Sequence, residues 1–258
     1  MLNYLKNKYR DTIYDIKTIG AMHVAASMCN RETFEPIKCI NEGRDIAICG
    51  AGPSLEKYRP LDEVMHIALN RALLNEKIHF EWFIADDWDG VDFFKEELLD
   101  YKCKKFFGHQ LGSADAYRQI PESFRIKCNA SRYYTNSYMK VDVWKAGFVC
   151  DIDRMAIANM PNIALSAMQI ALFTHPRRIY LVGCDASAGH FVQPKSINEE
   201  RIAAQEKDLK IAVSSEKVIA KWRELKEFAN IFYPDVEIIS INPVGLRGIF
   251  KDIYQDSN

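Results

Sequence analysis

The 258-residue sequence lacks long apolar runs, a strong net charge and any paired-cysteine motif. No apolar stretch is long enough to span a bilayer, and the charges spread over residues 1–30 do not resemble a signal peptide. A net charge of −1, with no basic run, gives no polybasic signal for nucleic acid or an anionic membrane. These absences favour a cytoplasmic protein, with peripheral contact to a membrane as the alternative.

The seven cysteines form neither a CxxC pair nor a Cys/His spacing typical of a metal site. Cys49 and Cys184 lie in apolar, strand-like runs, where a free cysteine behaves as a small hydrophobic residue. The sequence therefore predicts a reducing environment and no cysteine-based metal site. It also contains no internal repeat and no low-complexity segment.

The most informative stretch is the turn Gly50-Ala51-Gly52-Pro53-Ser54, which directly follows a short apolar run. The run predicts a buried strand, the glycines a tight turn, and the Pro-Ser pair the start of a helix. A helix that begins after such a turn offers backbone N–H groups to an anion such as phosphate. The third glycine of GxGxxG and the Lys-Ser/Thr of a P-loop are both missing. An ordinary strand-to-helix turn is the plain alternative.

Apolar runs alternate with amphipathic segments along most of the chain, which predicts an α/β fold. We expect a Rossmann-like, mostly parallel sheet with helices on both faces. Residues 1–44 would form an N-terminal helix and connector, and residues 45–258 the nucleotide-binding domain. Strands are expected at 46–48, 64–70, 80–85, 104–107, 178–185 and 236–241, and helices at 1–30, 71–76, 91–100, 162–173, 198–230 and 245–254.

Two segments stand apart from this alternation. Residues 1–30 are amphipathic with one basic side, which predicts packing on the domain or on a second subunit of a homo-oligomer; peripheral membrane contact is the alternative. Residues 108–153 are the least periodic and are rich in polar and aromatic side chains. We expect a lid-like insertion that faces the substrate, or otherwise a packed subdomain.

Polar residues follow several of the predicted strands. Because ligands bind outside the carboxyl ends of parallel strands, Asn70 and Asp86 or Asp87 are expected to meet one. Asp87 or Asp89 could instead cap the next helix, or the acids could hold a divalent cation.

Three blocks of the chain together resemble a known group of proteins. They are residues 48–55 with 68–70, then 162–172, then 180–185 with His190. Their order is similar to the bacterial sialyltransferases of glycosyltransferase family 42, the motility accessory factors and the 6-hydroxymethylpterin diphosphokinase-like domains. His190 follows the G-x-D strand end more closely than in the sialyltransferases, which resembles the other two branches.

The resemblance implies a transferase that uses a nucleotide, and it assigns residues to the site. It implies that Ser166 lies near the sugar nucleotide and that Asp185 faces the ligand. The nucleotide phosphates and ribose would be held by Gly50, Gly52, Pro53, Ser54 and Asn70, together with Asp86 from the strand-end pattern. We expect Asp185 and His190 to be the catalytic residues.

Glycosyl transfer from a nucleotide sugar, with a CMP-sugar favoured, is the predicted function. It needs a stabilised leaving phosphate, which requires no metal or other cofactor here, and a base for the acceptor hydroxyl. His190 has the right intrinsic pKa for that base. The acceptor would be a glycan, a protein or another hydroxyl compound. The alternatives are a Mg²⁺-dependent diphosphokinase that acts on a pterin-like alcohol, and a nucleotide-binding protein without catalysis.

Overall fold

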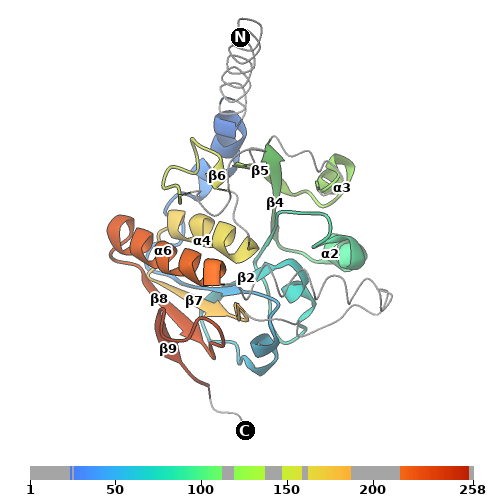
Figure 1. Ribbon diagram of the computed structural model, residues 1–258. Coiled ribbons are helices and arrows are strands. Elements are labelled where there is room, and N and C mark those ends of the chain that lie inside the picture. The colour runs from blue at the N-terminus through green and yellow to red at the C-terminus, as the bar shows by residue number, and fades with distance from the viewer. Residues whose placement is uncertain are drawn as a thin grey trace, which may run out of the picture.

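Nine strands in the described part of the chain form one sheet, and each neighbouring pair is parallel. The computed structural model describes residues 24, 26–111, 119–136, 147–158, 162–186 and 216–255 (Figure 1). The strands are β1 (Asp45–Cys49), β2 (Val64–Leu69), β3 (Trp82–Ala85), β4 (Lys104–Leu111), β5 (Ser131–Asn136), β6 (Ile157–Ala158), β7 (Arg178–Val182), β8 (Glu237–Ile241) and β9 (Lys251–Ile253). The predicted α/β fold with a parallel sheet is confirmed.

The order of the strands places a switch point in the middle of the sheet. It runs β6-β5-β4-β3-β2-β1-β7-β8-β9, so the chain builds outward from β1 in one direction and from β7 in the other. β1 and β7 lie side by side, with Cys49 opposite Val182 at their carboxyl ends. In open parallel sheets, the crevice for a ligand lies outside the carboxyl ends of the strands at such a point.

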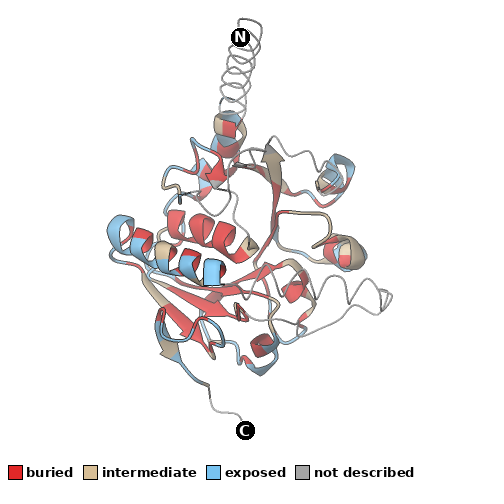
Figure 2. Cartoon of the chain, in the orientation of Figure 1, coloured by how far each residue is buried: buried red, intermediate tan, exposed pale blue. Residues whose placement is uncertain are grey.

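The central strands form because their apolar runs are covered on both faces. All five residues of β1 and all six of β2 are buried, which matches the continuous runs read from the sequence. Figure 2 shows the same pattern, with the central sheet buried and the exposed residues on the outer sides of the helices.

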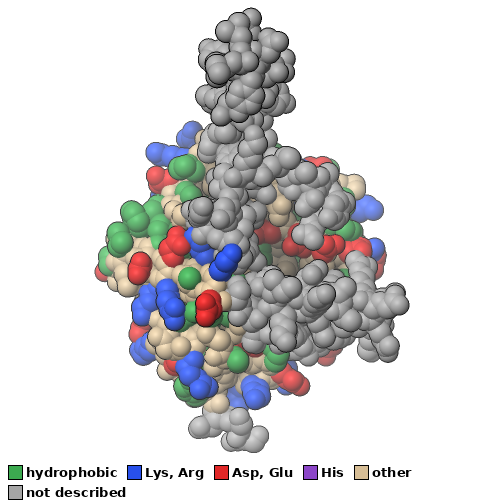
Figure 3. All heavy atoms as spheres, in the orientation of Figure 1, with side chains coloured by type: hydrophobic (Ala, Val, Ile, Leu, Met, Phe, Trp, Pro, Cys, Tyr) green, Lys and Arg blue, Asp and Glu red, His purple; other side chains and the backbone are tan. Residues whose placement is uncertain are grey.

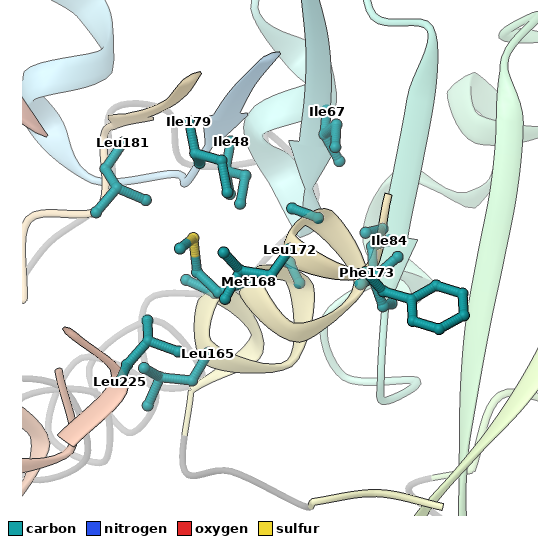
Figure 4. Packing of buried hydrophobic residues seen from close by; sticks show 14 of the residues in the cluster. Ile48, Ile67, Ile84, Leu165, Met168, Leu172, Phe173, Ile179, Leu181 and Leu225 are labelled. Carbon is teal, nitrogen blue, oxygen red and sulfur yellow. The ribbon is translucent and has the colours of Figure 1, made fainter. Parts of the chain in front are cut away.

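Helix α4 (Ile163–Phe173) covers one face of the sheet and contacts β1, β2 and β3. In Figure 4, Met168 and Leu172 point toward the strands, and Leu165 lies beside Leu225 of α6 (Glu216–Phe232). The expected buried helix at 162–173 is thus confirmed. Its first N–H groups are met in part by the Asn162 side chain, which accepts from the backbone of Ala164 at 2.8 Å.

Short helices cover the opposite face. Their apolar side chains, which include Leu55, Leu73, Phe94 and Phe124, join strand residues in a second buried cluster. The helices are η2 (Pro53–Lys57), η3 (Asn70–Leu74), η4 (Asp92–Phe94), α2 (Lys95–Asp100) and α3 (Glu122–Lys127). The predicted covering of both faces is therefore observed.

The helix expected over residues 245–254 is wrong. This segment makes turns and ends in the edge strand β9, which pairs with β8. Gly248 has a φ of +74°, which interrupts a helix, and its N–H donates to Asp252 Oδ2 at 2.9 Å. Residues 251–253 form a strand because they pair with β8, and the apolar pattern of so short a segment does not predict that pairing.

The connector expected over residues 31–44 is also partly helical. Helical residues continue through 26–34 into η1 (Glu35–Ile37), and Phe34 and Ile37 are fully buried. The Phe34 ring packs 5.7 Å from that of Tyr133, and the Asn30 side chain accepts from the Tyr134 backbone at 2.7 Å. Packing against β5 thus extends the helix beyond residue 30, where the amphipathic pattern of the sequence ends.

The interval 108–153 is more regular than predicted. It contains the end of β4, all of α3 and β5, whose Tyr133 and Thr135 are buried side chains of one face. Burial alternates along residues 132–135 of β5 with the period of a strand, although this interval was expected to be irregular. Residues 112–118 and 137–146 lie outside the described residues, and a lid in this interval stays a prediction.

The described surface carries both signs of charge. On the face shown in Figure 3, basic and acidic side chains are interspersed, in keeping with the net charge of −1. No helix among the described residues has the length and apolar character needed to cross a membrane.

Candidate functional site

The glycine turn after β1 packs directly against the end of β7. The N–H of Gly50 donates to Val182 O at 2.8 Å, and that of Gly52 donates to Gly183 O at 2.9 Å. The turn and the G-x-D strand end, recognised separately in the sequence, therefore form one unit at the switch point.

The glycines are required by this backbone contact. A Cβ on Gly50 would lie 2.6 Å from Gly183 O, and one on Gly52 would lie 2.6 Å from the same oxygen. Gly183 itself has a φ of +61°, a left-handed conformation that favours glycine. The sequence predicted that these glycines let a ligand approach the backbone closely. In the structure they let the turn after β1 approach the end of β7 instead.

Ser54 and Asp185 join the turn to β7 through a second set of bonds. The Ser54 N–H donates to Asp185 Oδ2 at 2.8 Å, and the Ser54 hydroxyl donates to Asp185 Oδ1. Burial raises the pKa of Asp185, while both bonds from Ser54 act to lower it. Gly52 occupies the N-cap position of η2, because the helix already begins at Pro53, and Ser54 lies inside its first turn.

The turn's backbone donors are therefore largely taken up inside the protein. The N–H of Leu55 donates to Gly52 O at 3.0 Å, and Pro53 has no N–H. The anion that Ser54 holds at the start of η2 is the protein's own Asp185 carboxylate. Ala51 and Gly52 are partly exposed and Pro53 is exposed, so the turn still presents a surface on which a nucleotide contact stays a prediction.

Asn70, at the carboxyl end of β2, carries an unsatisfied polar atom. Its Oδ1 is buried and has no hydrogen-bond partner within the described part of the chain. Its backbone has a φ of +48°, which asparagine tolerates better than most residues. Gly90 lies against it, because a Cβ there would be 2.9 Å from Asn70 Oδ1. A buried carbonyl oxygen without a donor is costly, and it suits a ligand that brings one.

Asp86 follows β3 and is buried among residues of three other elements. It accepts a hydrogen bond from the Tyr133 hydroxyl of β5, and Gly108 of β4 leaves the space that its carboxylate fills. Burial raises the pKa of Asp86 to about 6, and the nearby hydroxyls of Tyr133 and Ser166 oppose that shift. Burial and the negative charge of Asp86 raise the pKa of Tyr133 well above its usual value.

Ser166 approaches the same carboxylate from α4. Its side chain is 0% exposed, and its hydroxyl makes no hydrogen bond of normal geometry to any described residue. Asp86, Tyr133 and Ser166 therefore form a buried polar group on the α4 face of the sheet, near the carboxyl ends of β3 and β5. The sequence predicted Asp86 and Ser166 as site residues, and it offered Tyr133 only as one of three tyrosines, with Tyr134 and Tyr138, that could contact a leaving phosphate. Nothing in the sequence paired Tyr133 with Asp86, 47 positions away.

Asp87 binds a backbone N–H of the turn that follows β3, whereas the N-cap position of the next helix, η4, is Val91. Its Oδ1 accepts from the Gly90 N–H at 2.6 Å. Across the residues that the structure describes, no three His, Cys, Asp or Glu side chains come together as a metal site would require.

Comparison with solved structures finds several chains that are similar to this one. The chain is similar to the Campylobacter jejuni sialyltransferase CstII in complex with CMP-3FNeuAc, at 12% identity and a TM-score of 0.45, over 76% of this chain and 80% of that chain. It is similar to the monofunctional α-2,3-sialyltransferase Cst-I of the same organism, at 17% identity and a TM-score of 0.45, over 77% and 75%.

A third similar structure is the MAf glycosyltransferase of Magnetospirillum magneticum. Here the identity is 13% and the TM-score 0.48, over 91% of this chain and 38% of that chain. No family model matches the sequence, and no curated protein matches it.

His190, the expected base, lies outside the described residues, and its role stays a prediction. His109 on β4 is the other histidine that the sequence offers as a candidate base, and its ring packs 5.2 Å from that of Tyr134. Burial, and then the positive charge of Arg132, lower the pKa of His109.

The Asp86 carboxyl should make stability depend on pH. Its pKa is about 6 in the folded protein and about 3.8 in the unfolded chain, so the native state binds more protons in between. The free energy of unfolding should therefore fall as pH rises from about 4 to about 6, by up to about 3 kcal/mol. Asp86→Asn should remove this fall and be the more stable protein at pH 7.

Urea denaturation at several pH values measures this effect. Tyr133→Phe removes a hydrogen bond that lowers the pKa of Asp86. In this variant the free energy of unfolding should therefore continue to fall to a higher pH than in the native chain. Parallel curves for the native chain and Asp86→Asn would show that Asp86 does not titrate in this interval.

Proposed function

We propose that the chain transfers a sugar from a nucleotide sugar, with a CMP-sugar favoured, to an acceptor hydroxyl. The observation that supports this most is Asn70 Oδ1, which no described residue hydrogen-bonds and which lies at the carboxyl edge, one strand from the switch point of β1 and β7. A ribose or sugar hydroxyl would supply the donor that this oxygen lacks.

The other described groups suit the same part of such a ligand. Asp86 has carboxylate oxygens and Ser166 has a hydroxyl beside them, and both groups could bond the hydroxyls of a sugar or ribose. The partly exposed Ala51 and Gly52 and the exposed Pro53 would border the nucleotide. We propose His190 as the base that takes the acceptor's proton.

Nucleotide binding can be tested with a thermal-shift panel of CMP, CDP, UDP, GDP and ATP, each with and without Mg²⁺. A ligand that binds the native state raises the melting temperature. Metal-independent stabilisation by CMP is the expected result. Stabilisation by ATP that requires Mg²⁺ would favour diphosphate transfer instead, and no stabilisation by any nucleotide would overturn the proposal.

Turnover is then tested with CMP-sialic acid, UDP-glucose and GDP-mannose. Release of CMP from its sugar, accelerated by a saccharide acceptor, is the expected result. Tight binding of CMP without release from any of the three donors would favour a binding protein without catalysis.

Asn70 should contribute directly to nucleotide affinity. Asn70→Ala removes the amide and should weaken CMP binding by about 1–3 kcal/mol, because a buried hydrogen bond is lost. Asn70→Gly is the matched variant, since it loses the same amide but accommodates the φ of +48°. Calorimetric titration should find both variants equally weak, although the glycine variant is the more stable. Normal affinity in either folded variant would exclude Asn70 from the site.

A further inference from the structure

The chain that leaves β7 is held by contacts to three separate segments. The carbonyl of Gly183 accepts from the Gly52 N–H at 2.9 Å, and that of Asp185 accepts from the Gly245 N–H at 2.7 Å. Cys184 Sγ lies 3.8 Å from Ile48 O. The course of residues 183–186 is thus set by β1, the glycine turn and the segment after β8.

Close packing leaves this course little freedom. A Cβ on Gly245 would lie 2.7 Å from Ala186 O, and one on Gly52 would lie 2.5 Å from Asp185 Oδ2. Ala186 adopts a φ of +46°, which costs a residue with a side chain about 1–2 kcal/mol. Surrounding contacts must hold such a conformation in place.

The Asp185 side chain is the centre of these contacts. It is 4% exposed, and each of its oxygens accepts a bond from Ser54. A catalytic acid or base must reach the proton that it transfers, at about 2.6–3.2 Å from the substrate atom. Asp185 instead directs both oxygens at the start of η2.

We propose that Asp185 is a positioning residue, which fixes the direction of the chain as it leaves β7, and that it exchanges no proton with the substrate. The proposal rests on the proposed transferase function for its role in turnover. It replaces the catalytic assignment that the G-x-D resemblance implies. The carboxylate's partner is Ser54 of the same chain, so its function is to join the turn to β7.

Asparagine and alanine at position 185 separate the two roles. In Asp185→Asn, the amide oxygen can still accept from the Ser54 N–H, and the amide nitrogen can donate to the Ser54 hydroxyl. An asparagine cannot act as an acid or base. Asp185→Ala loses both bonds.

With the fastest of the three nucleotide-sugar donors, Asp185→Asn should keep kcat within about 3-fold of the native chain. Asp185→Ala should lose about 10–100-fold, as expected for misplaced groups near the chemistry. The acidic limb of the pH–rate profile should be the same in the native and asparagine proteins. A loss of about 10²–10⁴-fold in Asp185→Asn, with that limb abolished, would overturn the proposal by showing a proton-transfer role.

Amide hydrogen exchange gives a readout that does not depend on activity. The Ser54 N–H should exchange faster in Asp185→Ala and near the native rate in Asp185→Asn. Unchanged exchange in Asp185→Ala would overturn the proposal. If the native chain turns over no donor, the transferase function fails, while the exchange result still decides whether Asp185 fixes the turn.

Asp252→Ala is the matched control. Asp252 also accepts a backbone N–H, from Gly248 at 2.9 Å, but from a half-buried position in the edge strand β9. Its loss should leave both turnover and the exchange of the Ser54 N–H unchanged.

Discussion

Gly183→Ala is expected to lower the free energy of unfolding by about 2–5 kcal/mol. A side chain at this position meets two separate penalties. The φ of +61° disfavours any Cβ, and the added carbon would collide with Gly50 O and lie 2.9 Å from Leu55 Cβ. Because the first collision is with backbone, no rotation of a side chain relieves it. Urea denaturation followed by circular dichroism measures the loss.

Substitutions at two other glycines allow the conformational penalty to be measured without the collision. Gly43 and Gly248 have φ values of +75° and +74°, and a Cβ at either would meet nothing within 4 Å. Gly43→Ala and Gly248→Ala should therefore lose only the conformational part, about 1–2 kcal/mol. If Gly183→Ala were no less stable than these controls, the contact between the turn and β7 would not be as close as described.

His190→Ala is expected to reduce turnover by about 10²–10⁴-fold while nucleotide affinity changes little. The expectation rests on the sequence: His190 follows the G-x-D strand end by five positions, and an imidazole titrates near neutrality. A base removes the acceptor's proton in the transition state, so its loss lowers kcat and leaves the binding of the donor intact. Steady-state kinetics and CMP titration measure the two effects.

The acidic limb of the pH–rate profile should disappear in the same variant, because protonation of the base no longer limits turnover. His79→Ala is the control, since His79 is exposed before β3 and should affect neither quantity. Near-normal turnover in His190→Ala would place the base elsewhere, and His109→Ala would then be the next variant. A loss of nucleotide binding with the fold intact would assign His190 to the donor site instead.

The sequence predicted the central strands well because each is a continuous apolar run bounded by glycine or polar residues. It also predicted that Gly50, Asn70 and Asp86 follow strand ends, which is a local property of the chain. The position of β7 beside β1 is not local, and no periodicity reveals it. Only that pairing explains why the turn after β1 meets Asp185.

The errors have the same cause. β9 and the later part of β4 are strands because a neighbour supplies ladder bonds, and Tyr133 matters because it meets Asp86 across two strand spacings. A hydrogen bond between two residues of the chain also leaves fewer donors in a motif for a ligand. The Pro-Ser pair predicts an anion site, and among the described residues the anion that Ser54 binds is the Asp185 carboxylate, while a nucleotide contact at the turn stays a prediction.

The pairing of β1 with β7 also bears on how the chain is made. Asp45 and Arg178 are ion-paired at the start of these strands, 133 positions apart. During synthesis, β1 through β6 emerge first, and one side of β1 stays unpaired until β7 leaves the ribosome. An apolar strand with a free edge is a template for aggregation. The nascent chain should therefore depend on chaperones for most of its synthesis, and the turn at Gly50 gains its partner only after Asp185 has been made.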